Sequence, residues 1–76
     1  MGAPLFWVES VPSAGAEVLV SGPEGRHAVT VVRVRPGEII RIGDGRGSVA
    51  DCEVTEVAGK DKLRAKVRTF TFTDRP

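Results

Sequence analysis

Short apolar runs separated by turn-forming residues make up most of the chain. Three short segments of this kind lie at 5–8, 17–20 and 38–42, and two longer segments follow at 48–57 and 62–72. The longer segments alternate between apolar and polar positions, as strands with one buried face do. Glycine, proline and aspartate gather between the segments and predict turns. The pattern therefore predicts about five short strands.

The valine-rich stretch after the second run is ambiguous. Ser21 and Glu24 have the S-x-x-E spacing of a capping box, in which each side chain bonds the other residue's backbone N–H at a helix start. Four valines within residues 29–34 oppose a helix, because β-branched side chains lose rotational freedom there. We favour a helix of about ten residues that begins near Pro23 and stops before Pro36.

About five strands and one helix in 76 residues predict a small, mostly antiparallel β-barrel with the helix closing it. A chain of this size is one domain at most and has little apolar interior to line a deep pocket. Cys52 is the only cysteine, so neither an internal disulfide nor a metal site of clustered ligands is expected. No apolar run is long enough for a membrane helix, and we expect a cytoplasmic protein with no membrane partner.

Positive charge is concentrated in two blocks, residues 26–48 and residues 60–76, although the net charge of the whole is only +1. Residues 26–48 carry five arginines against two acids, for a local charge of +3. On an α-helix, Arg26, Thr30 and Arg33 share one face. Guanidinium groups grip phosphates bidentately, and glycine lets backbone amides approach the same anion. The candidate RNA-binding residues are Arg26, Arg33, Arg35 at the helix exit and Arg46 in the glycine-rich loop; the alternative is ordinary solvated arginines.

A second basic stripe lies on the last strand, where Lys62, Arg64, Lys66 and Arg68 alternate with apolar residues and share one face. If a two-residue turn joins this strand to the preceding one, acids of that strand lie opposite the stripe and neutralise it. The predicted pairs are Glu53 with Lys66, Asp51 with Arg68, Thr55 with Arg64, and Cys52 with Val67. We therefore expect a solvated sheet face here, not a binding site.

Phe70 and Phe72 continue the face of this stripe, so they form an exposed apolar patch unless a β-bulge changes the phase. Core packing through such a bulge is the first interpretation, docking on a partner domain the second and base stacking the third. His27, the only histidine, is interpreted as a packed or hydrogen-bonded helix residue, and Cys52 as a small apolar residue of the buried face. No catalytic residue is predicted.

Four short motifs occur together in the order and spacing of a known family. They are His27, Val31-Val-Arg33, Pro36-Gly-Glu38 and Asp44-Gly-Arg-Gly47. Together they resemble the amino-terminal domain of the RsmE family, the ribosomal RNA small subunit methyltransferase E enzymes. The resemblance spans residues 5 to about 70. Val32 replaces the leucine that is usual in the family, and the RNA role of Arg26 rests on its charge alone.

The resemblance implies a PUA-like antiparallel β-barrel of five to six strands with one short α-helix, over residues 1–72. It implies that residues 73–76 begin a linker to a SPOUT methyltransferase domain that is absent from this chain. In the family, that domain binds S-adenosylmethionine, forms a homodimer and methylates N3 of a uridine in 16S rRNA. No cofactor is expected in the present chain itself.

Charge pattern and resemblance together predict an RNA-recognition domain that holds 16S rRNA, or the small ribosomal subunit, for a separate catalytic domain of the same protein. The alternative is a structural or dimer-supporting domain that packs on the catalytic domain through Phe70 and Phe72 without contacting RNA. A third class, single-strand binders of the OB type, is disfavoured. Trp7 and three phenylalanines are the only large aromatic residues, and some of them must fill the core.

Overall fold

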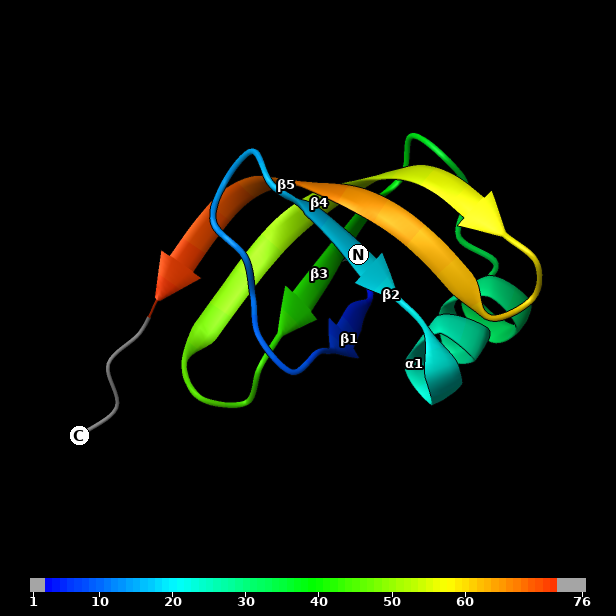
Figure 1. Ribbon diagram of the computed structural model, residues 1–76, viewed down its shortest axis with the longest axis horizontal. Helices are drawn as coiled ribbons and strands as arrows, with labels where there is room; N and C mark the ends of the chain where they lie inside the picture. Colours follow the sequence, from blue (N-terminus) through cyan, green and yellow to red (C-terminus); the bar gives the residue numbers. More distant parts are fainter. Residues whose placement is uncertain (1–2, 73–76) are drawn as a thin grey trace.

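The computed structural model describes residues 3–72, which form five strands and one helical segment (Figure 1). The strands are β1 (Leu5–Trp7), β2 (Glu17–Val20), β3 (Ile39–Gly43), β4 (Ser48–Ala58) and β5 (Lys62–Phe72), and the helical segment consists of α1 (Gly22–Arg26) and η1 (His27–Val32). All five strands expected from the sequence are present. The mostly β fold with one short helix is confirmed. The predicted linker at 73–76 lies outside the described residues.

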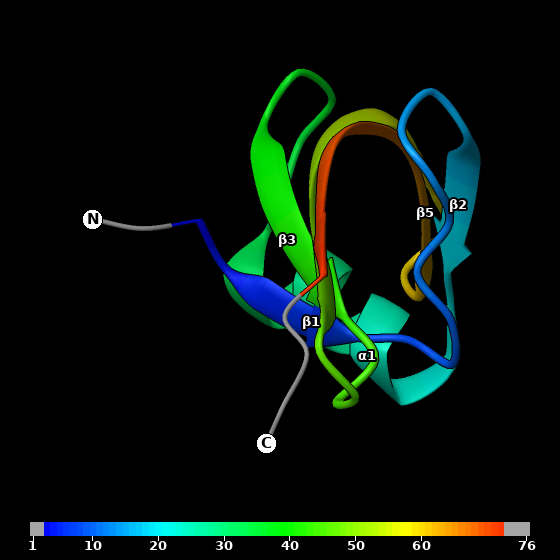
Figure 2. The same ribbon diagram turned by 90° about the vertical axis from the view of Figure 1, so that its left-hand side faces the viewer.

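The five strands form one sheet in the order β1-β3-β4-β5-β2. β1 joins β3 in parallel, whereas all the other pairs are antiparallel. β4 and β5 bend into an arch, so the sheet curls around its inner face (Figure 2). β1 and β2 are the two edges of the hydrogen-bonded ladder, and the helical segment lies at the open side of the arch. Within residues 3–72 the sheet therefore curls like a barrel without closing into one.

The hydrophobic core lies on the inner face of the arch. On β3, Ile40 and Ile42 are buried and alternate with the exposed Ile39 and Arg41, because successive side chains of a strand point to opposite faces. β4 and β5 follow the same rule over most of their length. The buried apolar residues are Phe6, Val20, Ala28, Val34, Ile40, Ile42, Ala50, Cys52, Val54, Leu63, Ala65 and Val67.

Two β-bulges divide the pairing of β4 with β5 into three stretches. In the middle stretch Glu53 lies opposite Lys66 and Cys52 opposite Val67, as predicted. The predicted pairing of Thr55 with Arg64 is wrong, because the turn spans the three residues 59–61 and not two. The register returns to the predicted one only through a bulge at Thr55, and Arg64 lies opposite Glu56.

The second bulge lies at Arg68 on β5. The predicted pairing of Asp51 with Arg68 is wrong, because Arg68 is the extra residue and Asp51 lies opposite Thr69. A single extra residue reverses which side chains face inward. The residues of β5 beyond Arg68 therefore change faces, so that Phe70 lies opposite the buried Ala50.

The helical segment begins where the sequence predicts, but the predicted capping box is wrong. Ser21 makes no side-chain cap bond. Glu24 Oε1 accepts a hydrogen bond from the backbone N–H of Trp7 at 2.6 Å instead. The carboxylate is drawn to an N–H on the edge strand β1, where backbone donors need partners from outside the sheet. Glu24 thereby ties the helical segment to β1.

The second half of the helical segment winds as a π-helix, η1. The valine-rich stretch is therefore helical, as favoured, but its winding is not that of an α-helix. Arg33 ends it in a left-handed conformation, with φ 62° and ψ 49°. The N–H groups of Arg33 and Val34 both donate to the Ala28 carbonyl oxygen. The helix therefore ends at Arg33, before the chain reaches the proline that was expected to stop it.

Gly25 lets the helical segment approach the sheet closely. A Cβ atom at Gly25 would clash with the carbonyl oxygen of Asp61 and lie 2.7 Å from that of Val20. Only glycine fits at this position of α1, where the helix packs against the β4–β5 turn and the end of β2. No helix among the described residues is long and apolar enough to cross a membrane.

Candidate nucleic-acid interface

Three of the four candidate arginines lie on or just after the helical segment, and all three are exposed. Arg26 is the last residue of α1, Arg33 follows η1, and Arg35 precedes the turn at Pro36-Gly37. Glu38 orders this turn: its Oε1 accepts from the backbone N–H of Arg35 at 2.6 Å, and its own N–H donates to the Arg35 carbonyl oxygen at 3.1 Å. This end of the molecule therefore presents guanidinium groups on an ordered backbone.

The predicted alignment of Arg26, Thr30 and Arg33 on one helix face is wrong. Spacings of four and seven residues align only in an α-helix, whereas η1 has the wider turn of a π-helix and Arg33 is left-handed. The Thr30 hydroxyl donates to the Arg26 carbonyl oxygen and so bonds within the helix. Arg26 and Arg33 therefore lie at the two ends of η1 but do not form one stripe.

Arg46 lies in the β3–β4 loop, away from the other candidates. Figure 1 shows this loop and the helix exit toward opposite ends of the long axis. Asp44 Oδ1 accepts from the backbone N–H groups of Arg46 at 2.7 Å and Ser48 at 3.2 Å. These bonds, that of Arg46 above all, hold the pKa of Asp44 below its usual value. The Arg46 guanidinium donates to the Glu9 carbonyl oxygen at 2.7 Å. Arg46 therefore adjoins the segment after β1.

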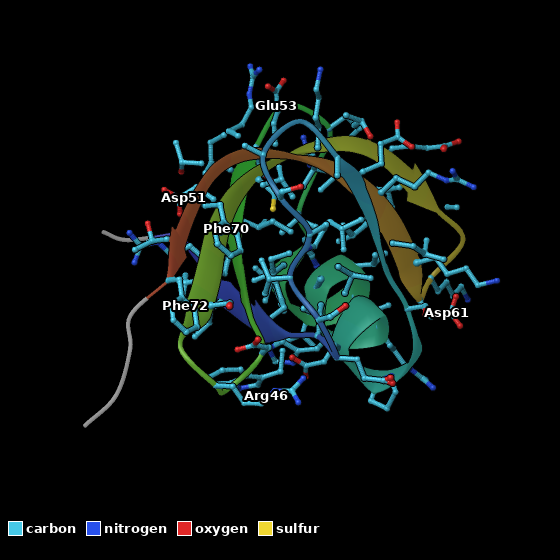
Figure 3. The ribbon with its side chains drawn as sticks, turned by 60° about the vertical axis from the view of Figure 1, so that its left-hand side comes forward. Arg46, Asp51, Glu53, Asp61, Phe70 and Phe72 are labelled. Atoms are coloured by element: carbon cyan, nitrogen blue, oxygen red, sulfur yellow. The ribbon has the colours of Figure 1, made fainter. Side chains whose placement is uncertain are left out.

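Carboxylates engage the arginines that lie on the outer face of the arch. The ion pairs are Arg41 with Asp51 at 2.9 Å, Arg68 with Glu53 at 2.6 Å, and Arg64 with Glu56 at 3.6 Å and Glu17 at 4.0 Å. Figure 3 shows Glu53 on this outer side. The basic stripe of β5 is therefore partly neutralised, as expected, although its partners differ from those predicted.

The candidate arginines differ from these in their electrostatic surroundings. Within residues 3–72, none of the four has a carboxylate oxygen within 4.0 Å of its guanidinium nitrogens. The positive charge of Arg26, Arg33 and Arg35 is therefore available to an external anion. That of Arg46 also acts on nearby Asp44, and its guanidinium bonds the Glu9 carbonyl oxygen. The candidate set is thus split in space, and the expectation that Arg46 extends the basic surface of the helix into one continuous edge is wrong.

Phe70 and Phe72 lie on the inner side of the arch, because the bulge at Arg68 has reversed the alternation (Figure 3). The phase change that the sequence left open does occur. The core covers the two rings only in part, since Phe70 is 41% and Phe72 58% exposed. These rings form an apolar patch next to the last described residues of the chain.

The surroundings of His27 and Cys52 indicate structural roles for both residues. The exposed ring of His27 lies edge-on to the buried Phe6, with ring centroids 6.1 Å apart. Cys52 is fully buried, and this burial, with a smaller effect of the Asp51 charge, raises the pKa of its thiol to about 11. No three His, Cys, Asp or Glu residues in the described part of the chain are grouped to hold a metal ion.

Trp7, for which the sequence pattern indicates no role, lies on an open groove. Trp7 is 55% exposed, and the groove between the ends of β1 and β2 has a volume of about 270 Å³. The expectation that few aromatic residues are exposed is wrong, because only Phe6 of the four is buried. A signal was present in the sequence: neighbouring strand residues face opposite sides, so a buried Phe6 requires an outward Trp7.

A family model described as RNA methyltransferase PUA domain matches residues 20–68. The match runs from the end of β2 through the helical segment and the β3–β4 loop into β5. This chain belongs to the RNA methyltransferase PUA domain family. The residues matched by the family model include every element that carries a candidate arginine.

Two relatives of this PUA domain indicate which group of RNA methyltransferases it is similar to. Proteins named Ribosomal RNA small subunit methyltransferase E from Mycobacterium bovis and Mycobacterium tuberculosis are each 52% identical to it over 67 residues. The matches cover 88% of this chain and 25% of each relative, so the chain spans about a quarter of the relatives' length. The resemblance to the RsmE family that the motifs indicated is confirmed.

Solved structures of larger methyltransferases contain the same fold. Ribosomal RNA small subunit methyltransferase E from Neisseria gonorrhoeae, bound to S-adenosyl methionine, has a TM-score of 0.78 and 27% identity, covering 97% of this chain and 30% of its own. A methyltransferase from Legionella pneumophila, also with bound cofactor, has a TM-score of 0.87 at 16% identity, covering 99% and 31%. The second likeness supports the fold alone.

Two small hollows lie on the surface of the described residues of this PUA domain. The groove at Trp7 and a second recess, formed on the outer face by Arg41, Val49, Asp51, Thr69 and Thr71, each have a volume of about 270 Å³. Sites for small molecules are usually enclosed clefts of about 300–1,000 Å³.

Proposed function

We propose that this chain is the RNA-recognition domain of an S-adenosylmethionine-dependent methyltransferase that modifies uridine N3 in 16S rRNA. It holds the rRNA in the cytoplasm for a catalytic SPOUT domain of the complete protein, which binds the cofactor and forms a homodimer. The family membership and the 52% identity to two rRNA methyltransferases support this substrate class.

The observation that carries the proposal is the contrast between the two sets of arginines. Arg41, Arg64 and Arg68 have carboxylate partners on the outer face, whereas no carboxylate lies within 4.0 Å of the four candidates among residues 3–72. Unpaired guanidinium groups contact phosphate without first breaking an ion pair. Arg26, Arg33, Arg35 and Arg46 therefore supply an electrostatic grip on RNA that does not depend on its sequence.

A chimera tests this function. The chain replaces the matching quarter of the Mycobacterium tuberculosis relative, and methylation of small ribosomal subunits is measured. In the proposed function, the double variant Arg33→Gln, Arg46→Gln lowers kcat/KM at least about tenfold, because two phosphate contacts are lost. The matched control Arg64→Gln, Arg68→Gln removes the same charge from the outer face and leaves kcat/KM within about threefold. Equal effects of the two double variants would contradict the proposal.

A second function is favoured by one observation, the partial exposure of Phe70 and Phe72. In this alternative the domain packs on the catalytic domain through these rings and does not contact RNA. The chimera separates the two functions. If Phe70→Ser, Phe72→Ser abolishes methylation while the arginine variants have no effect, the domain is structural.

A further inference from the structure

The groove at Trp7 lies in the opening between the two edge strands of the sheet. Its walls come from the end of β1 with the segment after it, and from the end of β2 with the start of α1. The lining residues are Trp7, Val8, Glu9, Leu19, Val20, Ser21, Pro23 and Glu24. We call this set the Trp7 groove. It joins apolar surface to two carboxylate-bearing residues within a volume of about 270 Å³.

The Trp7 backbone is fixed by hydrogen bonds, and its indole lies against β3. Its backbone N–H donates to Glu24 Oε1 at 2.6 Å, and the next N–H, of Val8, donates to the Gly43 carbonyl oxygen at 2.9 Å. A Cβ atom at Gly43 would lie 3.2 Å from the indole Cζ3, so the indole lies against the Gly43 backbone. Trp7 nevertheless remains 55% exposed, and Leu19 on the opposite wall is 53% exposed. The domain thus holds an aromatic platform in place and leaves it open.

The polar lining defines what can bind on this platform. Glu24 uses one carboxylate oxygen for the Trp7 N–H, and a carboxylate has further acceptor capacity on its second oxygen. Carboxylates accept hydrogen bonds from base amino groups, such as N4 of cytosine. The Arg46 guanidinium lies beside the groove, since it donates to the carbonyl oxygen of Glu9. A cation at the rim suits a ligand that carries phosphate.

We propose that the Trp7 groove binds one unpaired nucleobase of the RNA, stacked on the Trp7 indole, and prefers a base with an exocyclic amino group. This inference rests on the proposed RNA-binding function and adds a base contact to the phosphate contacts. Unpaired RNA bases are commonly recognised by stacking on aromatic side chains with hydrogen bonds to their edges. The proposal also explains why Arg46 lies apart from the other arginines: it binds the phosphate next to the stacked base.

Trp7 provides its own spectroscopic signal, because the chain contains one tryptophan and no tyrosine. Fluorescently labelled eight-nucleotide oligocytidine and oligouridine are titrated with the 76-residue chain, and RNA anisotropy and Trp7 emission are recorded in parallel. Stacking quenches Trp7 emission over the same range of concentration as the rise in anisotropy. Oligocytidine binds at least about fivefold more tightly than oligouridine, because uracil has no amino group for the carboxylates.

Three variants sharpen the test. Trp7→Ala lowers affinity for oligocytidine about 5- to 150-fold, as loss of one stacked base does, whereas Trp7→Phe keeps most of it. Phe72→Ala, which removes an exposed ring outside the groove, changes affinity less than about twofold. Glu24→Gln keeps an acceptor for the Trp7 N–H but adds a donor, so the preference for cytidine over uridine is lost.

The outcomes separate this inference from the proposed function. If RNA binds but Trp7 emission is unchanged and Trp7→Ala binds as the wild type does, the nucleobase site is excluded while RNA recognition stands. If neither oligonucleotide nor a 16S rRNA hairpin binds at low salt, RNA recognition itself fails and the base site fails with it.

Discussion

Arg33 combines a charged side chain with a backbone conformation that glycine adopts more easily. Its φ of 62° is the only positive value at a non-glycine position in the described chain. The left-handed conformation costs about 1–2 kcal/mol for a residue with a Cβ atom. The backbone alone favours glycine at this helix end. An arginine at such a position fits a side chain that has a function outside the fold, which is the phosphate contact proposed above.

Replacing Arg33 separates stability from binding. Arg33→Gly is expected to raise the free energy of unfolding by about 1 kcal/mol, measured by urea denaturation, and to weaken binding to a 16S rRNA hairpin. Arg33→Ala serves as the control, since it removes the charge but keeps the Cβ atom and gains no stability. An Arg33→Gly variant that binds RNA like the wild type would show that the side chain is not a contact.

The Cys52 thiol illustrates how burial in the arch changes chemistry. Burial raises its pKa to about 11, so the thiol stays protonated in the folded protein at pH 8.5. Iodoacetamide should alkylate the folded chain on the order of 100-fold more slowly than the urea-unfolded chain, because the reactive thiolate is that much rarer. The same shift makes stability fall as the pH rises from about 9 toward 11, since only the unfolded thiol ionises there. Equal labelling rates in the two states would contradict this burial.

Among the elements, the strands were predictable and their pairing was only partly so. Apolar runs located the three short strands, and alternation located the two long ones, because a half-buried strand must alternate. The bulges at Thr55 and Arg68 could not be read from the pattern, since they depend on the length of the turn and on how far two strands bend. As a result, Phe70 faces the inner side of the arch, and no local feature of the β5 sequence indicates this.

The helical segment has a different balance of success and failure. The Ser21–Glu24 spacing and Pro36 placed it correctly against the opposing signal of the valines, but the capping box itself does not form, because Glu24 accepts from a backbone donor on a strand distant in sequence. Local motifs compete with such long-range contacts, and the sequence contains no sign of the outcome. The same contact holds the backbone of Trp7. Glu24, which the sequence pattern assigned to a capping box, therefore supports the Trp7 groove, which the sequence pattern did not predict.

The packing of the helical segment on the sheet depends on Gly25. Gly25→Ala places a methyl group against the carbonyl oxygens of Asp61 and Val20, so the helix must shift away from the β4–β5 turn. We expect this variant to lose about 1–3 kcal/mol of unfolding free energy, despite the higher helix propensity of alanine. Thr30→Ala, at an exposed position of η1, should stay within about 0.5 kcal/mol of the wild type. A Gly25→Ala variant as stable as the wild type would refute this packing.

In the molecule as a whole, the arginines form two groups that differ in whether they have acidic partners. Arginines on its outer face are paired with acids of neighbouring strands, and those at the helix exit and the β3–β4 loop are not. Composition identified the candidate arginines, because their local excess of charge is visible in the sequence. Their division between two ends of the molecule follows from β3, because Arg33 and Arg35 precede this strand and Arg46 follows it.

The most direct test of this account is the salt dependence of RNA binding by the 76-residue chain. If the four unpaired arginines each contact a phosphate, the affinity for a 16S rRNA hairpin falls with a log–log slope of about −3 to −4, on the order of a hundredfold between 50 and 200 mM salt. Arg33→Gln with Arg35→Gln reduces this slope by about 1.5, whereas Arg64→Gln with Arg68→Gln leaves it unchanged. A slope near zero, or the same change in both double variants, would contradict the account.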